Sequence, residues 1–403
     1  MLGPIQLRDK VLRNIAAQGE VGASWLEALP SLLRRLEVEW GIKVGRPFPN
    51  ATEAFVSEAV TADGQQVALK IPIAGLAKAD HELSLLQTAN GRGYVRLLCH
   101  DRNSGARLLE RLGPQLAMLG LPIEEQIRII CRTLQQAWMP LPPGVSFPTG
   151  AEKALEMSSY ISTVWPRLGR PCSEKVIEVA LRFAEARRDA FDPADSILAH
   201  GDPHAWNTLL DRKTNECKFV DPDGLFIERA HDLSISMREW SAELLAGDPV
   251  ALGRKRCALL SRLTGTQESA IWQWGLIERL VNGLRYKEVG PEENAAEFLA
   301  VVEAWASGNG EALVQAHRQA ARRGCLAYHR EPGQAAVDRL DIKAVLGEQQ
   351  RMPADAATEI EHPPGTARVQ FRRDRHYCRV RFEPIGAPFA GGPALVPSLD
   401  RRR

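Results

Sequence analysis

The sequence predicts an α+β protein whose first part is rich in strands and whose second part is mainly helical. Short runs in which apolar and polar residues alternate lie between residues 55 and 113, separated by turn formers. Apolar residues spaced by three and four recur from 122 to 306, as on buried helix faces. With 44% hydrophobic and 25% charged residues, the composition is that of an ordinary globular protein, not of a collagen, a coiled coil or a disordered chain.

The chain is expected to begin with a helical segment over residues 5–40. Apolar residues from Trp25 to Trp40 fall at spacings of three and four, which places them on one helix face. Pro30 is expected to kink this segment or split it in two, because proline lacks the backbone N–H that a helix uses. The stretch 45–52 follows and is rich in turn formers.

A β-hairpin is predicted next. Residues 55–60 and 65–71 both have the pattern of strands, and Asp63 and Gly64 lie between them as turn formers. A helix and two more strands are expected after this hairpin, at 78–89, 94–101 and 106–113. Together these elements form the N-terminal lobe that we expect over 1–113.

The second lobe, expected over 114–307, is predicted to be mainly helical. The apolar period indicates helices at 122–138, 150–165, 173–190, 230–246, 249–262, 268–288 and 292–306. The stretch 197–224 is irregular and holds two short apolar runs suited to a hairpin. The remainder, 308–403, is rich in proline and arginine and shows no sustained period, so we expect a flexible tail.

Charge and cysteine content exclude several classes of protein. The 51 Lys and Arg nearly balance the 50 Asp and Glu, and a net charge of +1 gives no general attraction for nucleic acid or an anionic membrane. No apolar run approaches the ~18 residues of a membrane-spanning helix, and the amino end has no apolar signal core. The seven cysteines form no Cys-x-x-Cys motif, which favours a reducing cytoplasm over a disulfide framework or a zinc site.

The motif that carries the chemistry is His-Gly-Asp-Pro-His-Ala-Trp-Asn, residues 200–207. Asp202 and Asn207 have the spacing of the aspartate and asparagine in the protein-kinase catalytic loop. A carboxylate at the first position can accept the proton of an acceptor hydroxyl, and an amide oxygen at the second can bind a magnesium ion on the phosphates. Asp221 follows a short apolar strand and is placed to supply a second magnesium ligand.

Two plainer interpretations of these residues stay open. Each of the two segments also suits a simple turn, although their order and spacing argue against that. His200 and His204 would suit a zinc pair, but the pattern expected for a third ligand is absent from the sequence.

The chain resembles the aminoglycoside phosphotransferase family in its H-G-D-x-H-x-x-N motif and in the D-P-D-G segment after it. Further stretches resemble the branch of streptomycin 6-phosphotransferases and hydroxyurea phosphotransferases: GRPFPNATEAFVSEAVTADGQQVALKI, NGRGYVRLL, LLERLG and FLAVVEAWA. The resemblance covers about residues 20–307 and leaves the tail outside. It implies a protein-kinase-like, two-lobed fold that uses ATP and Mg²⁺.

By position, the resemblance also implies roles for single residues. Asp202 corresponds to the catalytic base, and Asn207 and Asp221 correspond to the magnesium ligands. Lys70, in Val-Ala-Leu-Lys, corresponds to the strand lysine that holds the α- and β-phosphates, and Glu82 in the following helix is its expected partner. The plainer alternatives are a solvent-exposed strand lysine and a glutamate on a solvated helix face.

The nucleotide-binding loop departs from the protein-kinase pattern. No G-x-G-x-x-G is present, so residues 50–54, with Asn50 and Thr52, are expected to cover the phosphates through backbone N–H groups. A simple connecting turn suits these residues equally well. Backbone groups from Glu110 to Leu112 are expected at the adenine edge, by analogy with the segment that links the lobes of kinases.

Three residues near the motif are given supporting roles. His200 is expected to prop the catalytic loop rather than to transfer protons. Asp232 resembles a family aspartate that supports this loop from the next helix. Trp206 is expected to pack beside the metal site, with a place in the wall of the acceptor pocket as the alternative.

Carboxylates of the helical lobe are the candidates for acceptor binding, because a streptomycin-like acceptor carries guanidinium groups. The candidates are Asp189, Asp192, Glu228 and Glu239. These acids also suit a solvated helix face, and hydroxyurea, which is small and neutral, needs no such cluster. The sequence does not decide between the two acceptors.

The leading hypothesis is a monomeric, cytoplasmic, ATP-dependent kinase that phosphorylates a small-molecule acceptor, with streptomycin favoured, and that has no nucleic-acid or membrane partner. One alternative keeps the fold and changes the acceptor to hydroxyurea or a metabolic alcohol. Another is a nucleotide-binding pseudoenzyme that acts as an interaction module. An RNA-contacting role for the arginine-rich stretch 368–381 is disfavoured, because acidic residues are interspersed in it.

Overall fold

The computed structural model describes residues 5–7, 9–48, 51–75, 79–308, 357–360, 369–374 and 377–382. Contacts divide the chain into two compact units. One, which we call the strand-rich unit, is made from residues 1–76 and 341–403; the other, the helical unit, is made from residues 77–340. The lobe boundaries expected at residues 113 and 307 stay predictions.

The strand-rich unit begins with two helices, α1 (Asp9–Ala17) and α2 (Gly19–Trp40). The centre of the apolar stripe predicted for α2 is buried, with Leu29, Leu33 and Leu36 at 1% exposure or less, while Trp25 and Trp40 at its ends are partly exposed. The split expected at Pro30 is wrong, because α2 continues through that residue, and the alternative of a kink there stays a prediction. The helical segment is interrupted earlier, before Gly19, whose φ of +56° is a left-handed conformation that favours glycine.

An antiparallel meander follows, made of β2 (Ile42–Pro47), β3 (Ala54–Thr61) and β4 (Gln66–Pro72). The predicted hairpin is confirmed as β3 and β4, which pair from Ala54 opposite Pro72 to Val60 opposite Gln66. β2 was not expected, because its stretch is rich in turn formers. It pairs with β3 from Ile42 opposite Thr61, so tertiary pairing overrides local propensity here.

A second antiparallel sheet has the strand order β1-β13-β12-β11. Its strands are β1 (Ile5–Leu7), β11 (Ala357–Ile360), β12 (Val369–Asp374) and β13 (Tyr377–Phe382). The helix expected over 5–7 is therefore wrong, and three strands lie within the expected tail. Apart from these strands and Gly308, the tail 308–403 lies outside the described residues.

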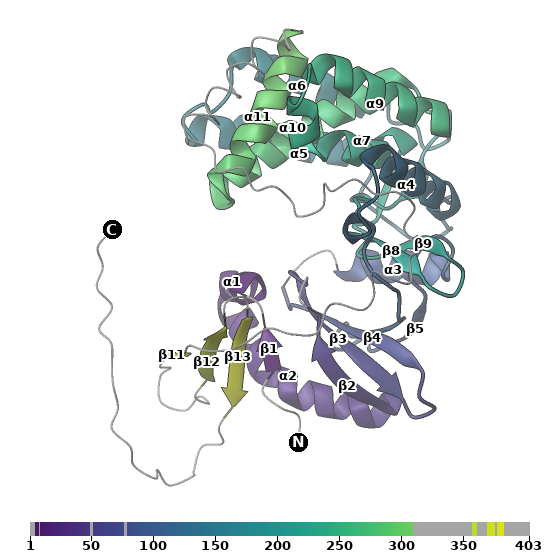
Figure 1. Ribbon diagram of the computed structural model, residues 1–403, viewed down its shortest axis with the longest axis vertical. Coiled ribbons are helices and arrows are strands. Elements are labelled where there is room, and N and C mark those ends of the chain that lie inside the picture. Colours follow the sequence, from purple (N-terminus) through teal and green to yellow (C-terminus); the bar gives the residue numbers. More distant parts are fainter. Residues whose placement is uncertain are drawn as a thin grey trace. The chain divides into compact units, whose positions relative to one another are not determined.

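The helical unit contains the predicted helices. They are α3 (Ala79–Ala89), α4 (Ile123–Ala137), α5 (Gly150–Arg167), α6 (Glu174–Asp189), α7 (Arg229–Arg238), α8 (Ser241–Leu245), α9 (Pro249–Thr264), α10 (Glu268–Val289) and α11 (Glu292–Ser307). The helix expected over 230–246 is in fact two, α7 and α8, because Glu239 is extended and Trp240 is left-handed with φ +56°. α10 packs against α5, α6, α7, α9 and α11 (Figure 1). It is buried over most of its length, with Trp274, Ile277 and Leu280 fully enclosed.

Short strands frame the loop that carries the motif. The helical unit also holds β5 (Leu97–His100), β6 (Arg107–Glu110), β7 (Ile197–Ala199), β8 (Thr208–Asp211), β9 (Glu216–Phe219), β10 (Leu225–Ile227) and the 3₁₀ turn η1 (Leu116–Met118). β8 pairs with β9 as the predicted hairpin, and β7 pairs with β10. The loop 200–207 leaves β7 and enters β8, while 220–224 leaves β9 and enters β10. The two pairings therefore bring the two motif segments together.

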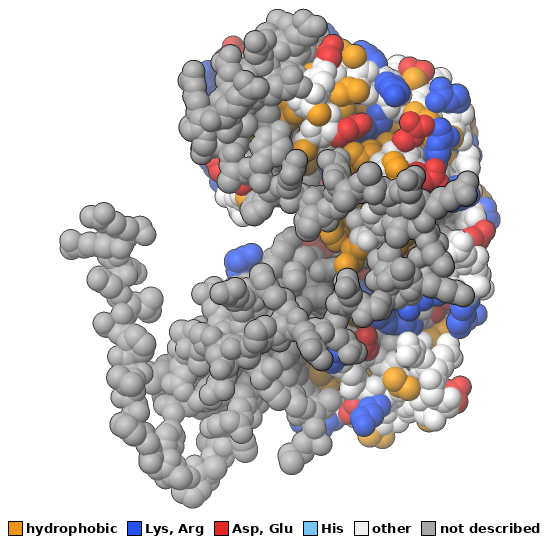
Figure 2. Space-filling view, in the orientation of Figure 1, with side chains coloured by type: hydrophobic (Ala, Val, Ile, Leu, Met, Phe, Trp, Pro, Cys, Tyr) orange, Lys and Arg blue, Asp and Glu red, His pale blue; other side chains and the backbone are white. Residues whose placement is uncertain are grey.

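These elements confirm the α+β class. Over the visible part of the helical unit, acidic and basic side chains are interspersed with apolar ones (Figure 2). None of the helices in the described ranges is long and apolar enough to cross a membrane.

Candidate active site

Asp232 fixes the start of the loop 200–207 from α7. Its side chain is fully buried, and its Oδ1 accepts a hydrogen bond from the Gly201 N–H at 2.8 Å. Oδ2 accepts bonds from the His200 N–H at 3.1 Å and from Trp138 Nε1 at 2.9 Å. Hydrogen bonds to a carboxylate are stronger than neutral ones, so one buried side chain holds two consecutive residues of the loop.

The His200 imidazole links the two motif segments. It is fully buried, its Nδ1 accepts from the Asp202 N–H at 3.0 Å, and its Nε2 donates to the Val220 carbonyl at 3.0 Å. Burial lowers the pKa of His200 despite the nearby carboxylates of Asp232 and Asp202, which keeps the ring neutral near pH 7. Both ring nitrogens are committed to backbone groups, so His200 supports the loop and is not half of a zinc pair.

Gly201 is required by both conformation and space. Its φ is +91°, and a Cβ there would lie 2.8 Å from the Cβ of Asp223 in the second motif segment. A residue with a side chain would be strained and would push the two segments apart.

The Asp202 carboxylate is held on both oxygens and still reaches solvent. Arg238 Nη2 lies 2.7 Å from Oδ1, and His204 Nε2 lies 3.3 Å from Oδ2. Burial would raise the pKa of Asp202, but the charges of Arg238 and His204 outweigh burial and hold the pKa well below its usual range. The side chain is 31% exposed, so an ionised and oriented carboxylate faces the surface of the loop.

His204 completes the turn of the loop. Its Nδ1 accepts from the Asn207 N–H at 3.2 Å. Burial opposes protonation of the ring, but the carboxylates of Asp202 and Glu239 outweigh burial and raise the pKa of His204. Protonation at Nδ1 would add positive charge beside Asp202, but it would replace this acceptor with an N–H, so the bond from the Asn207 N–H would be lost.

Asn207 and Asp221 offer the oxygen ligands that a magnesium ion prefers. Asn207 Nδ2 donates to the Asp202 carbonyl at 3.1 Å, which leaves the amide oxygen for a cation, and the Asn207 carbonyl accepts from the Val220 N–H at 2.9 Å. Asp221 is exposed and has φ +56°, a strained conformation of the kind that gathers at functional sites. In the part of the chain that the structure describes, no group of three His, Cys, Asp or Glu side chains could hold a metal by itself.

The structure adds Arg238, which the sequence reasoning missed. Besides Asp202, its guanidinium contacts Glu239 Oε1 through Nε at 3.0 Å and Glu278 Oε2 through Nη1 at 3.4 Å. An arginine in the last turn of the helix that carries Asp232 was visible in the sequence. The contact between Arg238 and Glu278 could not be predicted from the sequence, because Glu278 lies on α10, far along the chain.

Lys70 and Glu82 are both buried, at 8% and 7% exposure. The alternative of a solvent-exposed strand lysine is therefore wrong. Glu82 Oε2 accepts from Arg107 Nη1 at 3.0 Å, and this arginine is itself buried. Lys70 belongs to the strand-rich unit and Glu82 to the helical unit, so their pairing stays a prediction.

The residues expected around the nucleotide are partly described. Asn50 lies outside the described residues, and the Thr52 carbonyl accepts from Asn14 Nδ2 at 2.8 Å. The Glu110 carboxylate is bound by Lys218 Nζ at 2.6 Å and by the Arg96 N–H at 2.8 Å. The carbonyl of Leu112 accepts from Arg111 Nη1 at 3.0 Å. The Glu110 side chain thus has structural partners, and the adenine contacts of the backbone stay a prediction.

The four acceptor candidates are in different environments. Asp189 is exposed beside Arg188, and Asp192 Oδ1 accepts from the Ala194 N–H at 2.8 Å. Glu228 is bound by Trp274 Nε1 at 2.9 Å and by Arg187 Nη1 at 3.2 Å. Of the four, Glu239 alone shares a partner with Asp202, namely Arg238.

Trp206 is exposed on the loop, and its expected place, beside the metal site or in the wall of the acceptor pocket, stays a prediction. Its side chain is 43% exposed, and only its carbonyl is used locally, as the acceptor of a 3.0 Å bond from Gln115 Nε2.

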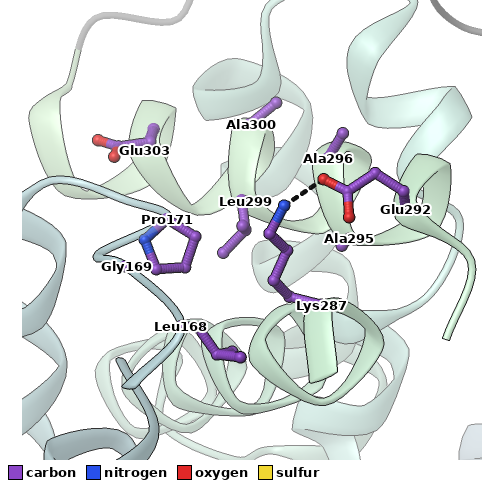
Figure 3. A pocket seen from close by; sticks show the side chains of 10 residues that line it. All are labelled: Leu168, Gly169, Pro171, Lys287, Glu292, Ala295, Ala296, Leu299, Ala300 and Glu303. Carbon is purple, nitrogen blue, oxygen red and sulfur yellow. Dashed lines mark hydrogen bonds and ion pairs between the residues drawn. The ribbon is translucent and has the colours of Figure 1, made fainter. Parts of the chain in front are cut away.

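A separate pocket of about 440 Å³ lies where the α5–α6 connection meets α10 and α11 (Figure 3). Lys287 and Glu292 form an ion pair in its wall, and Glu303 there accepts from the backbone N–H and hydroxyl of Ser173. No residue expected in the active site lines it. Its charged groups are already satisfied within the chain.

Comparison with known proteins agrees with this geometry. The family model for aminoglycoside/hydroxyurea antibiotic resistance kinases matches residues 48–290. The chain is 27% identical over 292 residues to a streptomycin 6-kinase of Streptomyces griseus, covering 72% of this chain and 92% of the relative. It is 25% identical over 270 residues to a streptomycin 6-kinase of Streptomyces glaucescens, with coverage of 66% and 86%. It is 26% identical over 275 residues to a hydroxyurea phosphotransferase of Kitasatospora aureofaciens, with coverage of 63% and 76%.

The matched region contains the catalytic loop, Asp232 and Arg238, and it spans more than half of the sequence. The resemblance inferred from the motifs is thereby confirmed, together with the protein-kinase-like fold class and a phosphotransferase activity. The chain belongs to the aminoglycoside/hydroxyurea antibiotic resistance kinase family.

Proposed function

We propose that this protein transfers the γ-phosphate of ATP to a hydroxyl group of an aminoglycoside, with streptomycin as the acceptor. The observation that carries the proposal is the Asp202 carboxylate, ionised by its pairing with Arg238 and partly exposed on the catalytic loop. Such a carboxylate accepts a hydrogen bond from a hydroxyl, orients it toward the phosphate, and takes its proton as the new bond forms.

Asn207 and Asp221 would hold the magnesium ion of the nucleotide. When bound, that ion neutralises charge on the transferring phosphoryl group. The chain's own part is to present the two oxygens from segments that are fixed to each other, through the Val220–Asn207 and His200–Val220 hydrogen bonds. In a loose transition state, such positioning supplies most of the catalysis.

Lys70 is proposed to hold the α- and β-phosphates, with Glu82 as its partner. Its burial at 8% exposure supports this role, because a buried ammonium group needs a partner of opposite charge. Backbone N–H groups around Thr52 are proposed to cover the phosphates, and the backbone from Glu110 to Leu112 to meet the adenine.

Two observations support the streptomycin acceptor. Both relatives from Streptomyces are streptomycin 6-kinases. The Glu239 carboxylate is 26% exposed and joined to Asp202 through Arg238, and we propose that it pairs with a cationic group of the acceptor. Hydroxyurea is the second candidate, because the hydroxyurea phosphotransferase has a comparable identity of 26%, although over a smaller share of each chain.

The proposed setting is the cytoplasm, where ATP is available. Its reducing conditions suit the five free cysteines of the described residues, Cys99, Cys131, Cys172, Cys217 and Cys257.

The test is to measure kcat/KM for streptomycin, kanamycin and hydroxyurea under one buffer and salt, with labelled ATP. We expect streptomycin to give the highest value. Labelled product from kanamycin or hydroxyurea but not from streptomycin would refute the acceptor and leave the kinase. No labelled product from any acceptor, simple alcohols included, would favour a nucleotide-binding pseudoenzyme.

A further inference from the structure

Arg238, the last residue of α7, is a buried guanidinium shared by three carboxylates. Its Nη2 lies 2.7 Å from Asp202 Oδ1, its Nε lies 3.0 Å from Glu239 Oε1, and its Nη1 lies 3.4 Å from Glu278 Oε2. The arginine side chain is 11% exposed and that of Glu278 is 7% exposed. Because a guanidinium is planar with donors in fixed directions, three partners on different edges determine its position.

Glu278 anchors the far edge of this guanidinium to the central helix α10. Its Oε2 also accepts from Asn282 Nδ2 at 3.2 Å, and its Oε1 lies 3.4 Å from His231 Nε2. The carboxylate is therefore fixed from α7 and from α10.

The backbone around Arg238 is fixed as well. Two buried arginines bind carbonyls at the end of α7: Arg279 Nε donates to Met237 O at 2.9 Å, and Arg256 Nη1 donates to Ser236 O at 3.1 Å. A second bond from each reaches the carbonyl of Glu239, at 2.9 and 2.8 Å. Both the side chain and the main chain of Arg238 are thus held in one place.

We propose that Arg238 is a positioning residue for phosphoryl transfer, which fixes the Asp202 carboxylate in the orientation that receives the acceptor hydroxyl. The proposal rests on the proposed function, in which Asp202 is the catalytic carboxylate. With one oxygen of Asp202 bound to Arg238, the rotation of the carboxylate is restricted, and its exposed part is presented to the acceptor. Reaction rates depend steeply on such geometry, since a misplacement of about 1 Å can cost ~10²-fold.

If Arg238 had a purely structural role, its substitution would have a different effect. A buried ion pair that only supports the core would, when weakened, lower stability without a selective effect on kcat. Arg187 provides the matched control, because its side chain is 14% exposed and it forms a 3.2 Å ion pair with Glu228 in the same unit. No contact joins Arg187 to Asp202 among the described residues.

The experiment compares Arg238→Gln, Arg238→Lys and Arg187→Gln with the wild type. Two activities are measured: transfer to the best acceptor of the wild type, and slow hydrolysis of ATP by water without an acceptor. We expect Arg238→Gln to lower kcat ~10²-fold in both while KM for ATP stays within about two-fold. Arg238→Lys should recover part of kcat, because lysine keeps one donor for Asp202 but cannot span three carboxylates. Arg187→Gln should keep kcat within about two-fold.

Several results would overturn the proposal. One is a folded Arg238→Gln or Arg238→Lys protein with the kcat of the wild type. If the glutamine variant does not fold, the kcat of the lysine variant alone tests the proposal. Another is an equal loss of kcat in Arg187→Gln. Failure of the proposed function looks different, because it is seen without Arg238 variants: either the wild type transfers the γ-phosphate of ATP neither to an acceptor nor to water, or Asp202→Ala is as active as the wild type.

Discussion

Removing the charge of Glu278 is expected to destabilise the protein in a pH-dependent way. The Glu278→Gln substitution keeps the size of the side chain and removes its charge. Burial alone would raise the pKa of this carboxyl, but the contact with His231 and the charges of Arg238 and Lys153 outweigh burial and lower its pKa to about 2. The ionised form is thus favoured in the folded protein.

The size of the effect follows from linkage. One pKa unit corresponds to about 1.4 kcal/mol, so a change from 4.5 in the unfolded chain to about 2 in the folded protein makes the charge worth about 3 kcal/mol at neutral pH. Because the folded pKa is the lower one, this stabilisation is fully present above about pH 4.5 and is lost as the pH falls through about 2. At pH 3.5 roughly 2 kcal/mol should remain.

The assay is urea unfolding of both proteins at pH 7, 5 and 3.5, followed by tryptophan fluorescence and circular dichroism. Glu178→Gln is the control, because that glutamate is 71% exposed and its nearest cation, Lys175, is 3.9 Å away. The control should match the wild type at each pH. Equal stability of Glu278→Gln and the wild type at pH 7, or a difference that does not shrink between pH 5 and 3.5, would refute the reasoning.

Three further predictions concern the catalytic loop. Asp202→Ala should lower kcat by ~10²–10⁴ and leave ATP binding nearly intact. A near-normal kcat in this variant would show that Asp202 has no part in the mechanism. Asn207→Ala and Asp221→Ala should each raise the magnesium concentration needed for half-maximal activity, and titrations that overlay the wild-type curve would contradict the ligand assignment. Gly201→Ala should melt several degrees lower than Gly169→Ala: both glycines have positive φ, +91° and +74°, but a Cβ at Gly169 meets nothing within 4 Å. Equal melting temperatures of the two variants would show that the loop accepts a Cβ at residue 201 without loss of stability.

The proximity of the two motif segments, 200–207 and 220–224, was predictable because both are local in sequence. Asp202 and Asn207 lie five residues apart in one turn, and Asp221 follows the hairpin that this turn begins. Asp232 was also within reach, as it comes early in the next helix. For such residues, the spacing along the chain is enough to predict that they lie close together, because few conformations of the chain connect them.

Arg238 and Glu278 could not be paired from the sequence. They are 40 residues apart, and their contact depends on how α7 packs against α10. The same limit applies to Glu82 and Arg107, which come from a helix and a strand. The sequence contains many acidic residues and arginines, and only the folded structure shows which of them form ion pairs.

The missed strands have a related cause. β1 is three residues long and pairs with β13, more than 360 residues away, so nothing local marks it. β2 contains Gly45 and Pro47, which weaken its strand pattern. The split expected at Pro30 is the opposite error, since the buried face of α2 outweighs the cost of a proline in a helix.

Transfer of label from [γ-³²P]ATP to streptomycin, by the wild type and by Asp202→Ala in parallel, tests the central claim most directly. We expect a labelled phosphoester of streptomycin from the wild type. We expect a rate lower by ~10² or more from the variant, with both proteins equally folded and equally able to bind ATP. Label in streptomycin at the same rate from both proteins would contradict the proposed function, because the Asp202 carboxylate would then be dispensable.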